Sequence, residues 1–262
     1  MIRTVAFQTR ARTVDHLGRE QIADCPTAIS ELWKNAFDAY ARAVTLDIYD
    51  GREPVAVISD DGHGMNRDEF EGRWLVVGTE SKATADRTIA ADRNGLRARP
   101  RQGQKGIGRL SCANLGPVLL FVSKRGAHPF VAALLDWRLF ENPFVNLADV
   151  HVPITEFKNK EDLFRLLPEL VQELKQNVLG GEDKTRSARL KAAWNAYDEL
   201  YRAEQKAQPA SKLSVPSVDI LNSIVKIELA LPGIEWVILG DHRAGSMQVR
   251  TLRRRYSSLR NP

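Results

Sequence analysis

Three polar side chains near residue 35 have the types and spacing needed for chemistry on a bound phosphate. Glu31, Asn35 and Asp38 follow one another at intervals of four and three residues. In an α-helix they lie within an arc of roughly 60°. Such a row is also typical of an ordinary solvated helix face, and alone it favours that interpretation. Two glycine-rich segments further along the chain change the balance.

The first glycine-rich segment is VISDDGHGM, residues 57–65, where an acidic pair directly follows an apolar run. Gly62 and Gly64 can take backbone angles denied to other residues, and they let a flat ligand approach the main chain. A carboxylate there can accept a hydrogen bond from an exocyclic amine. The alternative is a tight polar turn, in which Asp-Gly is common.

The second segment is GQKGIGRLSCANLG, residues 103–116, a glycine-rich loop that runs into an expected helix. Its backbone amides and the positive end of the helix are suited to an anion such as a phosphate. The segment lacks the GxxxxGK-[ST] pattern of a P-loop. It also does not follow a strand, as the dinucleotide fingerprint requires.

The elements that must position these residues alternate along the first half of the chain. Asp24 and Pro26 open an expected helix with an apolar stripe that continues to Tyr40. Strands are expected over 44–50, 54–59, 118–124 and 129–137, and a capping box at Asn66 and Glu69 opens a further helix. After residue 150 we expect two amphipathic helices separated by Gly180-Gly181, strands over 215–231 and 234–240, and a solvated arginine-rich tail.

Length, cysteine content and charge limit the class of protein. The 262 residues are 43% hydrophobic, which allows a sizeable core and excludes disorder. Cys25 and Cys112 form neither a metal motif nor a disulfide framework, which favours a cytoplasmic protein. The sequence contains no apolar run of 18 residues, which indicates a protein that does not enter a membrane. Residues 82–109 carry eight basic and two acidic side chains, and residues 242–262 carry six arginines and no acid. The charge is too uneven for a uniformly basic nucleic-acid binder.

Taken in order, ELWKNAFDAYA, DDGHGM, WLVVGTESK and GQKGIGRLS resemble the GHKL superfamily of ATPases, named for gyrase, heat-shock chaperone, histidine kinase and MutL. The resemblance covers roughly residues 20–140, and DAYA and GTESK are most similar to the MutL, MORC and heat-shock chaperone branch. It implies an α+β, Bergerat-type two-layer sandwich in which helices cover one face of a mixed sheet, with a C-terminal helical hairpin. Residues 1–150 would form the ATP-binding core, and 151–262 would extend the same domain.

The resemblance also implies a role for each matching residue. Glu31 would be the catalytic base that activates water, Asn35 would hold Mg²⁺, and Asp61 would accept from the adenine amino group. Asp38 would help order the adenine side through water. The remaining expected ATP-binding residues are Gly64, Met65, Lys82, Gly103, Lys105, Gly106, Ile107, Gly108 and Arg109.

Two further expectations concern segments around the site. The arginine-rich residues 80–102 stand where the family places its ATP lid, and we expect a mobile loop that orders over the triphosphate. A nucleic-acid surface is the alternative explanation of these arginines, and the two are compatible. The family also places a Thr on a late strand near adenine, for which Thr155 is a weak candidate.

The predicted function is Mg²⁺-dependent binding and slow hydrolysis of ATP to ADP and phosphate, with lid closure coupled to homodimerisation. A DNA or protein partner, and a role in DNA repair, genome maintenance or defence, rest on analogy alone. One alternative is a nonenzymatic module that binds nucleic acid or a partner in response to ATP. A histidine kinase is disfavoured, because only His16 precedes the Glu31 helix.

Overall fold

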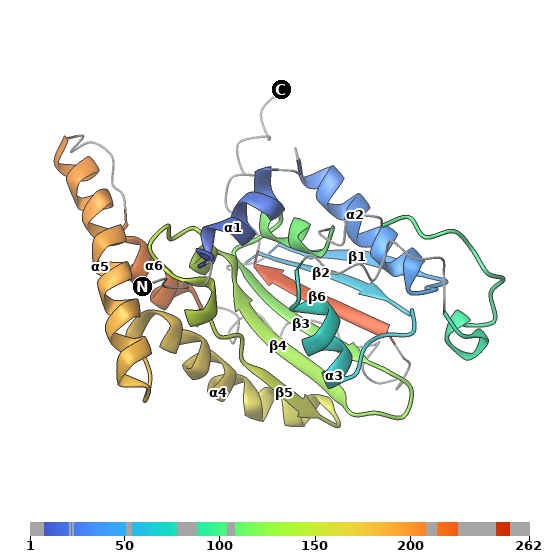
Figure 1. The fold of residues 1–262 in the computed structure, drawn as a ribbon. Helices are drawn as coiled ribbons and strands as arrows, with labels where there is room; N and C mark the ends of the chain where they lie inside the picture. Colours follow the sequence, from blue (N-terminus) through green and yellow to red (C-terminus); the bar gives the residue numbers. More distant parts are fainter. Residues whose placement is uncertain are drawn as a thin grey trace, which may run out of the picture.

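The computed structural model describes residues 8–20, 22, 24–50, 54–77, 88–103, 108–207, 214–224 and 245–251. A six-stranded sheet lies at the centre of this part of the chain, and helices pack around it (Figure 1). Its strands are β1 (Val44–Tyr49), β2 (Val55–Asp60), β3 (Val118–Lys124), β4 (Phe130–Asp136), β5 (Ile154–Phe157) and β6 (Gly245–Thr251).

The order of strands in the sheet is β1-β2-β6-β3-β4-β5, so the last strand of the chain lies in the middle. All strand pairs among the described residues are antiparallel. The predicted α+β class is confirmed. The predicted mixed sheet is not, because these pairs form an antiparallel sheet. Every side chain of β4 is buried, and on β3 only Lys124 is not. Because successive side chains point to opposite faces, both faces of these strands are covered, whereas the expected sandwich has helices on one face.

The helix that carries the polar row of Glu31, Asn35 and Asp38 begins and ends as its sequence indicates. In α2 (Cys25–Asp38) the N-cap Asp24 accepts a hydrogen bond from the Thr27 amide at 2.8 Å, and Pro26 occupies the first turn. Ala28, Leu32 and Ala36 form its buried stripe. The helix stops before Tyr40, whose φ of 59° is left-handed.

The predicted capping box is also present. The Asn66 side chain accepts from the Glu69 amide at 2.9 Å, and the Asn66 amide donates to the Glu69 carboxylate at 3.2 Å. This box opens α3 (Arg67–Glu69), which continues as a π-helical turn, η2 (Phe70–Trp74). Phe70 and Trp74 stack with ring centroids 5.0 Å apart, and Phe121 of β3 lies 4.9 Å from Phe70. The aromatic contacts fasten this helix to the sheet.

The second half of the described chain is mainly helical. Helices α4 (Lys160–Leu179) and α5 (Lys184–Ala207) lie on either side of Gly180-Gly181, and α4 packs against β4 and β5. Shorter elements complete the fold: α1 (Arg12–Asp15), η1 (His16–Glu20), η4 (Ala90–Arg93), η5 (Gly108–Asn114), η6 (Trp137–Phe140), η7 (Leu147–Asp149) and α6 (Pro216–Ile224). Among the described residues, a hydrophobic cluster includes buried side chains from Ala11 to Ile224.

Two predictions for the last 50 residues are wrong. A strand was expected over 215–231, but residues 216–224 form helix α6, which buries Ile220 and Ile224 at helical spacing. Residues 225–231 and the expected strand 234–240 lie outside the described residues. Residues 245–251 were expected in a solvated tail, yet they form β6 between β2 and β3. Pairing on both sides stabilises this strand, and that gain does not show in the local sequence.

Candidate functional site

Two members of the polar row on α2, Glu31 and Asn35, lie beside the beginning of η5. A Cβ atom placed on Gly108 would lie 2.9 Å from Oε2 of Glu31 and 3.7 Å from Nδ2 of Asn35. The Glu31 carboxylate is the far end of a flexible side chain and could move aside, so these distances show that Gly108 lies directly beside Glu31 and Asn35. Glu31 is 27% exposed and pairs with Nζ of Lys34 at 2.7 Å. The structure thus brings the first and third sequence motifs together.

The third side chain of the row, Asp38, binds the other described end of the glycine-rich loop. Its two carboxylate oxygens accept from the backbone amides of Gln102, at 2.8 Å, and Gly103, at 3.0 Å. Asp38 was expected to act on the adenine side through water. The contacts place its carboxylate on the main chain that leads into the loop.

The Asp-Gly motif after β2 lies against the end of α2. A Cβ on Gly62 would be 2.8 Å from both Cβ and O of Ala39, and the His63 amide donates to the Ala39 carbonyl at 2.9 Å. Gly64 has a φ of 64°, in the left-handed region that favours glycine. The second sequence motif therefore adjoins α2, the helix that carries the polar row.

The two aspartates of this motif have different surroundings. Oδ1 of Asp61, the expected adenine acceptor, accepts from the backbone amides of Arg42 at 2.7 Å and Ala43 at 2.8 Å. It ties together the turn between α2 and β1. Asp60 ends β2, and its Oδ1 accepts from the Gly62 amide at 2.9 Å. Counting back from Gly62 and Gly64, the Asp-x-Gly-x-Gly spacing begins at Asp60, a signal in the sequence that points to this residue.

Two neighbouring strands complete the surroundings of this motif. The Met65 amide donates to Oγ of the buried Ser123 on β3 at 2.8 Å, which fixes the chain after Gly64. On β6, the backbone of Ser246 is the register partner of both Asp60 and Ser123. Ser246 directly follows Gly245, so a hydroxyl residue after glycine stands on the strand next to Asp60. The sequence alone did not indicate Ser246, because the arginine-rich composition of this segment predicted a solvated tail.

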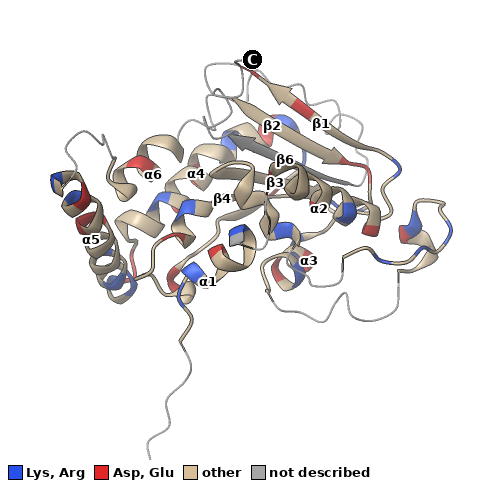
Figure 2. Ribbon diagram, turned by 90° about the horizontal axis from the view of Figure 1, so that it is seen from above, with Lys and Arg blue, Asp and Glu red and all other residues tan. Residues whose placement is uncertain are grey.

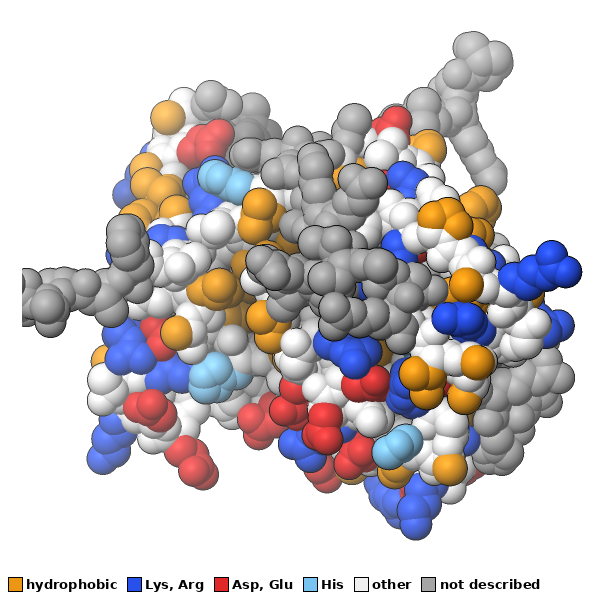
Figure 3. Space-filling view, turned by 45° about the vertical axis from the view of Figure 1, so that its right-hand side comes forward, with side chains coloured by type: hydrophobic (Ala, Val, Ile, Leu, Met, Phe, Trp, Pro, Cys, Tyr) orange, Lys and Arg blue, Asp and Glu red, His pale blue; other side chains and the backbone are white. Residues whose placement is uncertain are grey.

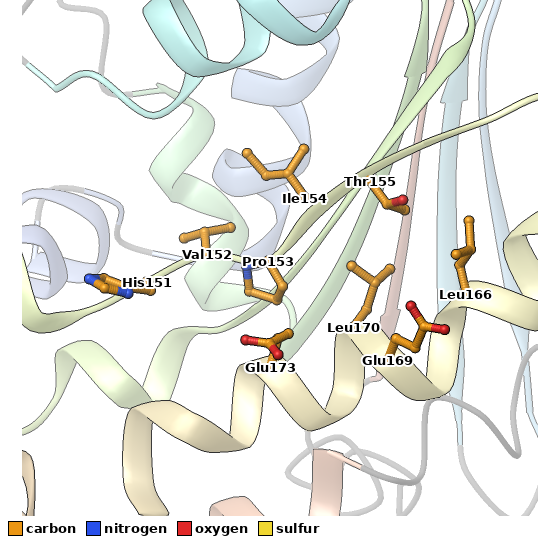
Figure 4. Close-up of a pocket in the computed structure, with 9 residues that line it drawn as sticks. All are labelled: His151, Val152, Pro153, Ile154, Thr155, Leu166, Glu169, Leu170 and Glu173. Atoms are coloured by element: carbon orange, nitrogen blue, oxygen red, sulfur yellow. The ribbon is translucent and has the colours of Figure 1, made fainter. Parts of the chain in front are cut away.

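Thr155 lies elsewhere in the molecule. It is on β5, at the edge of the sheet, with three strands between it and β2. There it lines a cavity of about 260 Å³ between residues 151–155 and α4, beside Leu166, Glu169 and Leu170 (Figure 4). This position separates Thr155 from the Asp-Gly motif.

Comparison with known proteins agrees with this arrangement. Residues 24–157, just over half of the chain, match the family described as histidine kinase-, DNA gyrase B- and HSP90-like ATPase. The chain belongs to this ATPase family. All three motifs, and β1 to β5 that position them, fall within the matched residues.

A curated relative is the DNA mismatch repair protein MutL of Ehrlichia chaffeensis (strain ATCC CRL-10679 / Arkansas). It is 27% identical over 114 residues, which are 43% of this chain. The same alignment covers 16% of MutL, so the chain spans less than a fifth of that relative's length. The likeness does not extend over the whole relative.

Only part of the family's phosphate loop falls within the described residues. Lys82, Lys105, Gly106 and Ile107 lie outside them, so their expected roles remain predictions. Arg109 is the second residue of η5, and its Nη2 donates to the Val76 carbonyl. Burial lowers the pKa of the Arg109 guanidinium, whose ordinary value is so high that the group remains a cation.

The described part of the expected lid, residues 88–102, makes contacts with distant parts of the fold, and its expected mobility stays a prediction. Residues 88–103, here called the basic arm, extend beside the end of α2 at the right of Figure 1. Arg125 binds Asp92, and the Arg42 guanidinium donates to the Asn94 carbonyl at 2.8 and 2.6 Å. Asn94 in turn donates to the Asp61 carbonyl at 3.2 Å. Contacts between distant side chains, absent from the local pattern, hold this arm.

The expected magnesium ligand has surroundings that fit a hard cation. Among the described residues, no group of three or more His, Cys, Asp and Glu side chains could hold a metal. Mg²⁺ in phosphate-binding sites usually has one or two protein ligands and keeps several waters. Asn35 offers one amide oxygen beside the Glu31 carboxylate and the glycine of the loop. The donor set is therefore suited to an ion held jointly with phosphate oxygens.

Charged side chains of both signs occur on the views of the described part of the chain in Figures 2 and 3. In Figure 2 the charged positions at the start of α5 are basic and those of its second half are of both signs, while several basic positions mark the arm. On the face in Figure 3, Lys and Arg side chains are interspersed with acidic and apolar ones. Within the described ranges no helix is both long and apolar enough to cross a bilayer.

Proposed function

We propose that this protein binds Mg²⁺-ATP between α2, the Asp-Gly motif and the glycine-rich loop, and hydrolyses it slowly to ADP and phosphate. The observation that carries the proposal is the close approach of Gly108 to Glu31 and Asn35. This approach puts a carboxylate and an amide beside the end of a loop with the composition of an anion site, where η5 begins. Membership of the ATPase family supports the same assignment.

Each part of the site has a distinct task in this proposal. Asn35 holds the magnesium ion, which when bound would offset the charge of the phosphates. Glu31 accepts a proton from the attacking water and orients it. Amides from Lys105 to Arg109 donate to phosphate oxygens, Gly103 belongs to the start of the same loop, and the cation of Arg109 adds to the positive potential of the loop. Lys82 and Lys105 remain candidates for contact with the terminal phosphate.

We assign the acceptor for the adenine amino group to Asp60 in place of Asp61. Asp60 has the spacing of the family motif, whereas Oδ1 of Asp61 already accepts two backbone amides. Gly64 leaves room for the base, and Met65 packs beside it. The family's hydroxyl residue on a late strand near adenine is then Ser246, in place of Thr155, because Ser246 of β6 is paired with Asp60.

We also propose that residues 151–262 complete the same domain. Strand β6 inserts between β2 and β3, and the cluster of buried side chains includes residues of α4, α5 and α6. Homodimerisation on ATP binding, a cytoplasmic location and an association with DNA are further parts of the proposal. The DNA association rests on the named function of the MutL relative.

The test is a phosphate-release assay with ATP, with and without Mg²⁺ and with and without duplex DNA. Slow Mg²⁺-dependent turnover supports the proposal, and a change of rate with DNA supports the association. Binding of ATP without turnover would favour the nonenzymatic alternative. Retention of acid-labile label from γ-labelled ATP on the protein would favour a histidine kinase.

A further inference from the structure

The glycine-rich loop of the proposed site is attached to one helix at both of its described ends. At Gly103 the attachment is the pair of hydrogen bonds to the Asp38 carboxylate. At Gly108 it is the close contact with Glu31 and Asn35. All three side chains belong to the last eight residues of α2. Both described ends of the loop therefore lie against the same helix.

The attachment at Gly103 uses the full accepting geometry of a carboxylate. Oδ1 accepts from the Gln102 amide and Oδ2 from the Gly103 amide, so two successive N–H groups are fixed by one side chain. Hydrogen bonds to an ionised acceptor are roughly twice as strong as neutral ones. An amide side chain has only one accepting atom and would turn its NH₂ group toward the second donor.

A second side chain reinforces the attachment from the arm. The Arg99 guanidinium carbon lies 3.8 Å from the ring centroid of Phe37 and 4.8 Å from that of Tyr40. Its Nη2 donates to the carbonyls of Phe37, at 2.5 Å, and Ala41, at 3.3 Å. Carbonyls at the C-terminal end of a helix carry partial negative charge and favour a cation there. Arg99 therefore fastens the arm four residues before Gly103.

The adenine side of the proposed site is held by different contacts. Gly62 and His63 contact Ala39, and the Met65 amide donates to Ser123. Neither Asp38 nor Arg99 takes part in these interactions. A change at Asp38 would therefore disturb the start of the loop and leave Asp60 and Gly64 in place.

We propose that Asp38 is a positioning residue, supported by Arg99, that holds the phosphate loop in register with Glu31 and Asn35. Its effect is on binding of the phosphates, and adenine recognition does not depend on it. The inference rests on the proposed nucleotide site. It replaces the role on the adenine side that the sequence suggested for Asp38.

The first experiment measures exchange of backbone amides without any nucleotide. In Asp38→Asn, the amides of Gln102 and Gly103 should exchange about ten times faster than in the unchanged protein, because one charged acceptor is lost. Asp47→Asn, at an exposed position of the edge strand β1, is the matched control and should leave them unchanged. Unaltered exchange in Asp38→Asn would overturn the attachment.

The second experiment titrates adenosine and ADP separately by NMR. In Asp38→Asn the affinity for ADP should fall about tenfold to a hundredfold, while the affinity for adenosine stays the same. Arg99→Gln should show a smaller loss in the same direction, and Arg97→Gln, at an exposed position of the arm, should show none. Equal losses for adenosine and ADP would overturn the proposal in favour of a role beside adenine.

Failure of the proposed function has a different signature. If the unchanged protein binds neither adenosine nor ADP, the nucleotide site itself is wrong. The exchange experiment still reports whether Asp38 holds Gly103, because it uses no ligand. Retained ADP affinity in Asp38→Asn, combined with faster exchange, would show that the attachment exists but does not position the phosphates.

Discussion

The end of α2 and the hairpin of α4 and α5 use polar side chains in contrasting ways. In the hairpin, Asn177 is 1% exposed, and its side chain binds the His151 backbone, Arg186 and the Leu174 carbonyl. At the end of α2, carboxylates contact glycines and loop amides close to the surface. A saturated buried group adds stability, whereas partly exposed carboxylates beside glycines leave room for a ligand. The two regions should therefore respond differently to substitution.

The largest effect should come from Glu31→Gln. Loss of a general base lowers turnover by about 10² to 10⁴. The affinity for ADP and the free energy of unfolding should change little, because the substitution preserves shape. Single-turnover hydrolysis and chemical denaturation measure the two quantities. Turnover equal to that of the unchanged protein would remove Glu31 from the catalytic role.

Leu174→Ala in α4 should lower stability and leave ATP binding unchanged, the reverse of the effect expected for Glu31→Gln. Leu174 is fully buried, and its truncation should reduce the free energy of unfolding by about 2 to 5 kcal/mol. KM for ATP should stay the same at a temperature where the variant is folded. Urea denaturation and steady-state kinetics test this. A change in KM with unchanged stability would break the contrast between the two regions.

The pair Asp60→Asn and Asp61→Asn sharpens the comparison within the site itself. Asp60→Asn should lower ATP affinity by about tenfold to a hundredfold, since it removes the proposed acceptor for adenine. Asp61→Asn should retain that affinity and lower the free energy of unfolding by about 1 to 2 kcal/mol, because it weakens two backbone hydrogen bonds. Calorimetric titration and thermal denaturation of both variants measure these effects. The opposite result would restore Asp61 as the acceptor.

The smallest effect concerns the ion pair between Asp149 and Arg189 of α5. The hydrogen bond from Arg189 holds the pKa of the Asp149 carboxyl below its usual value of 3.8. A lowered folded pKa adds stability above pH 3.8, which is lost as the pH falls through the folded value. Asp149→Asn should cost about 1 kcal/mol at pH 7, since Arg189 is half exposed.

A pH series of urea denaturation checks this prediction. The difference between the unchanged protein and Asp149→Asn should narrow below pH 4, where the carboxyl becomes protonated. ATP turnover at pH 7 should be the same in both. A stability difference that stays constant down to pH 2 would show that the ion pair does not cause it.

Local patterns predicted much of the fold around the site. The cap at Asp24, the stripe of Leu32 and Ala36, and the capping box at Asn66 are short-range features, and the structure contains all of them. The motifs around Glu31, Gly62 and Gly108 also meet, as their order indicated. Choosing between Asp60 and Asp61 needed the contacts, although the spacing of the glycines already favoured Asp60.

What the sequence determined by itself is therefore the family, the elements of the first half and the set of residues that meet at the end of α2. These depend on spacing, and helical and strand periods are local properties. The tertiary structure alone decided that residues 245–251 form the central strand β6, that the basic arm is fastened to α2, and that Asp38 binds the start of the loop. Each of these depends on partners more than 50 residues away in the chain, whose contacts outweigh local preference.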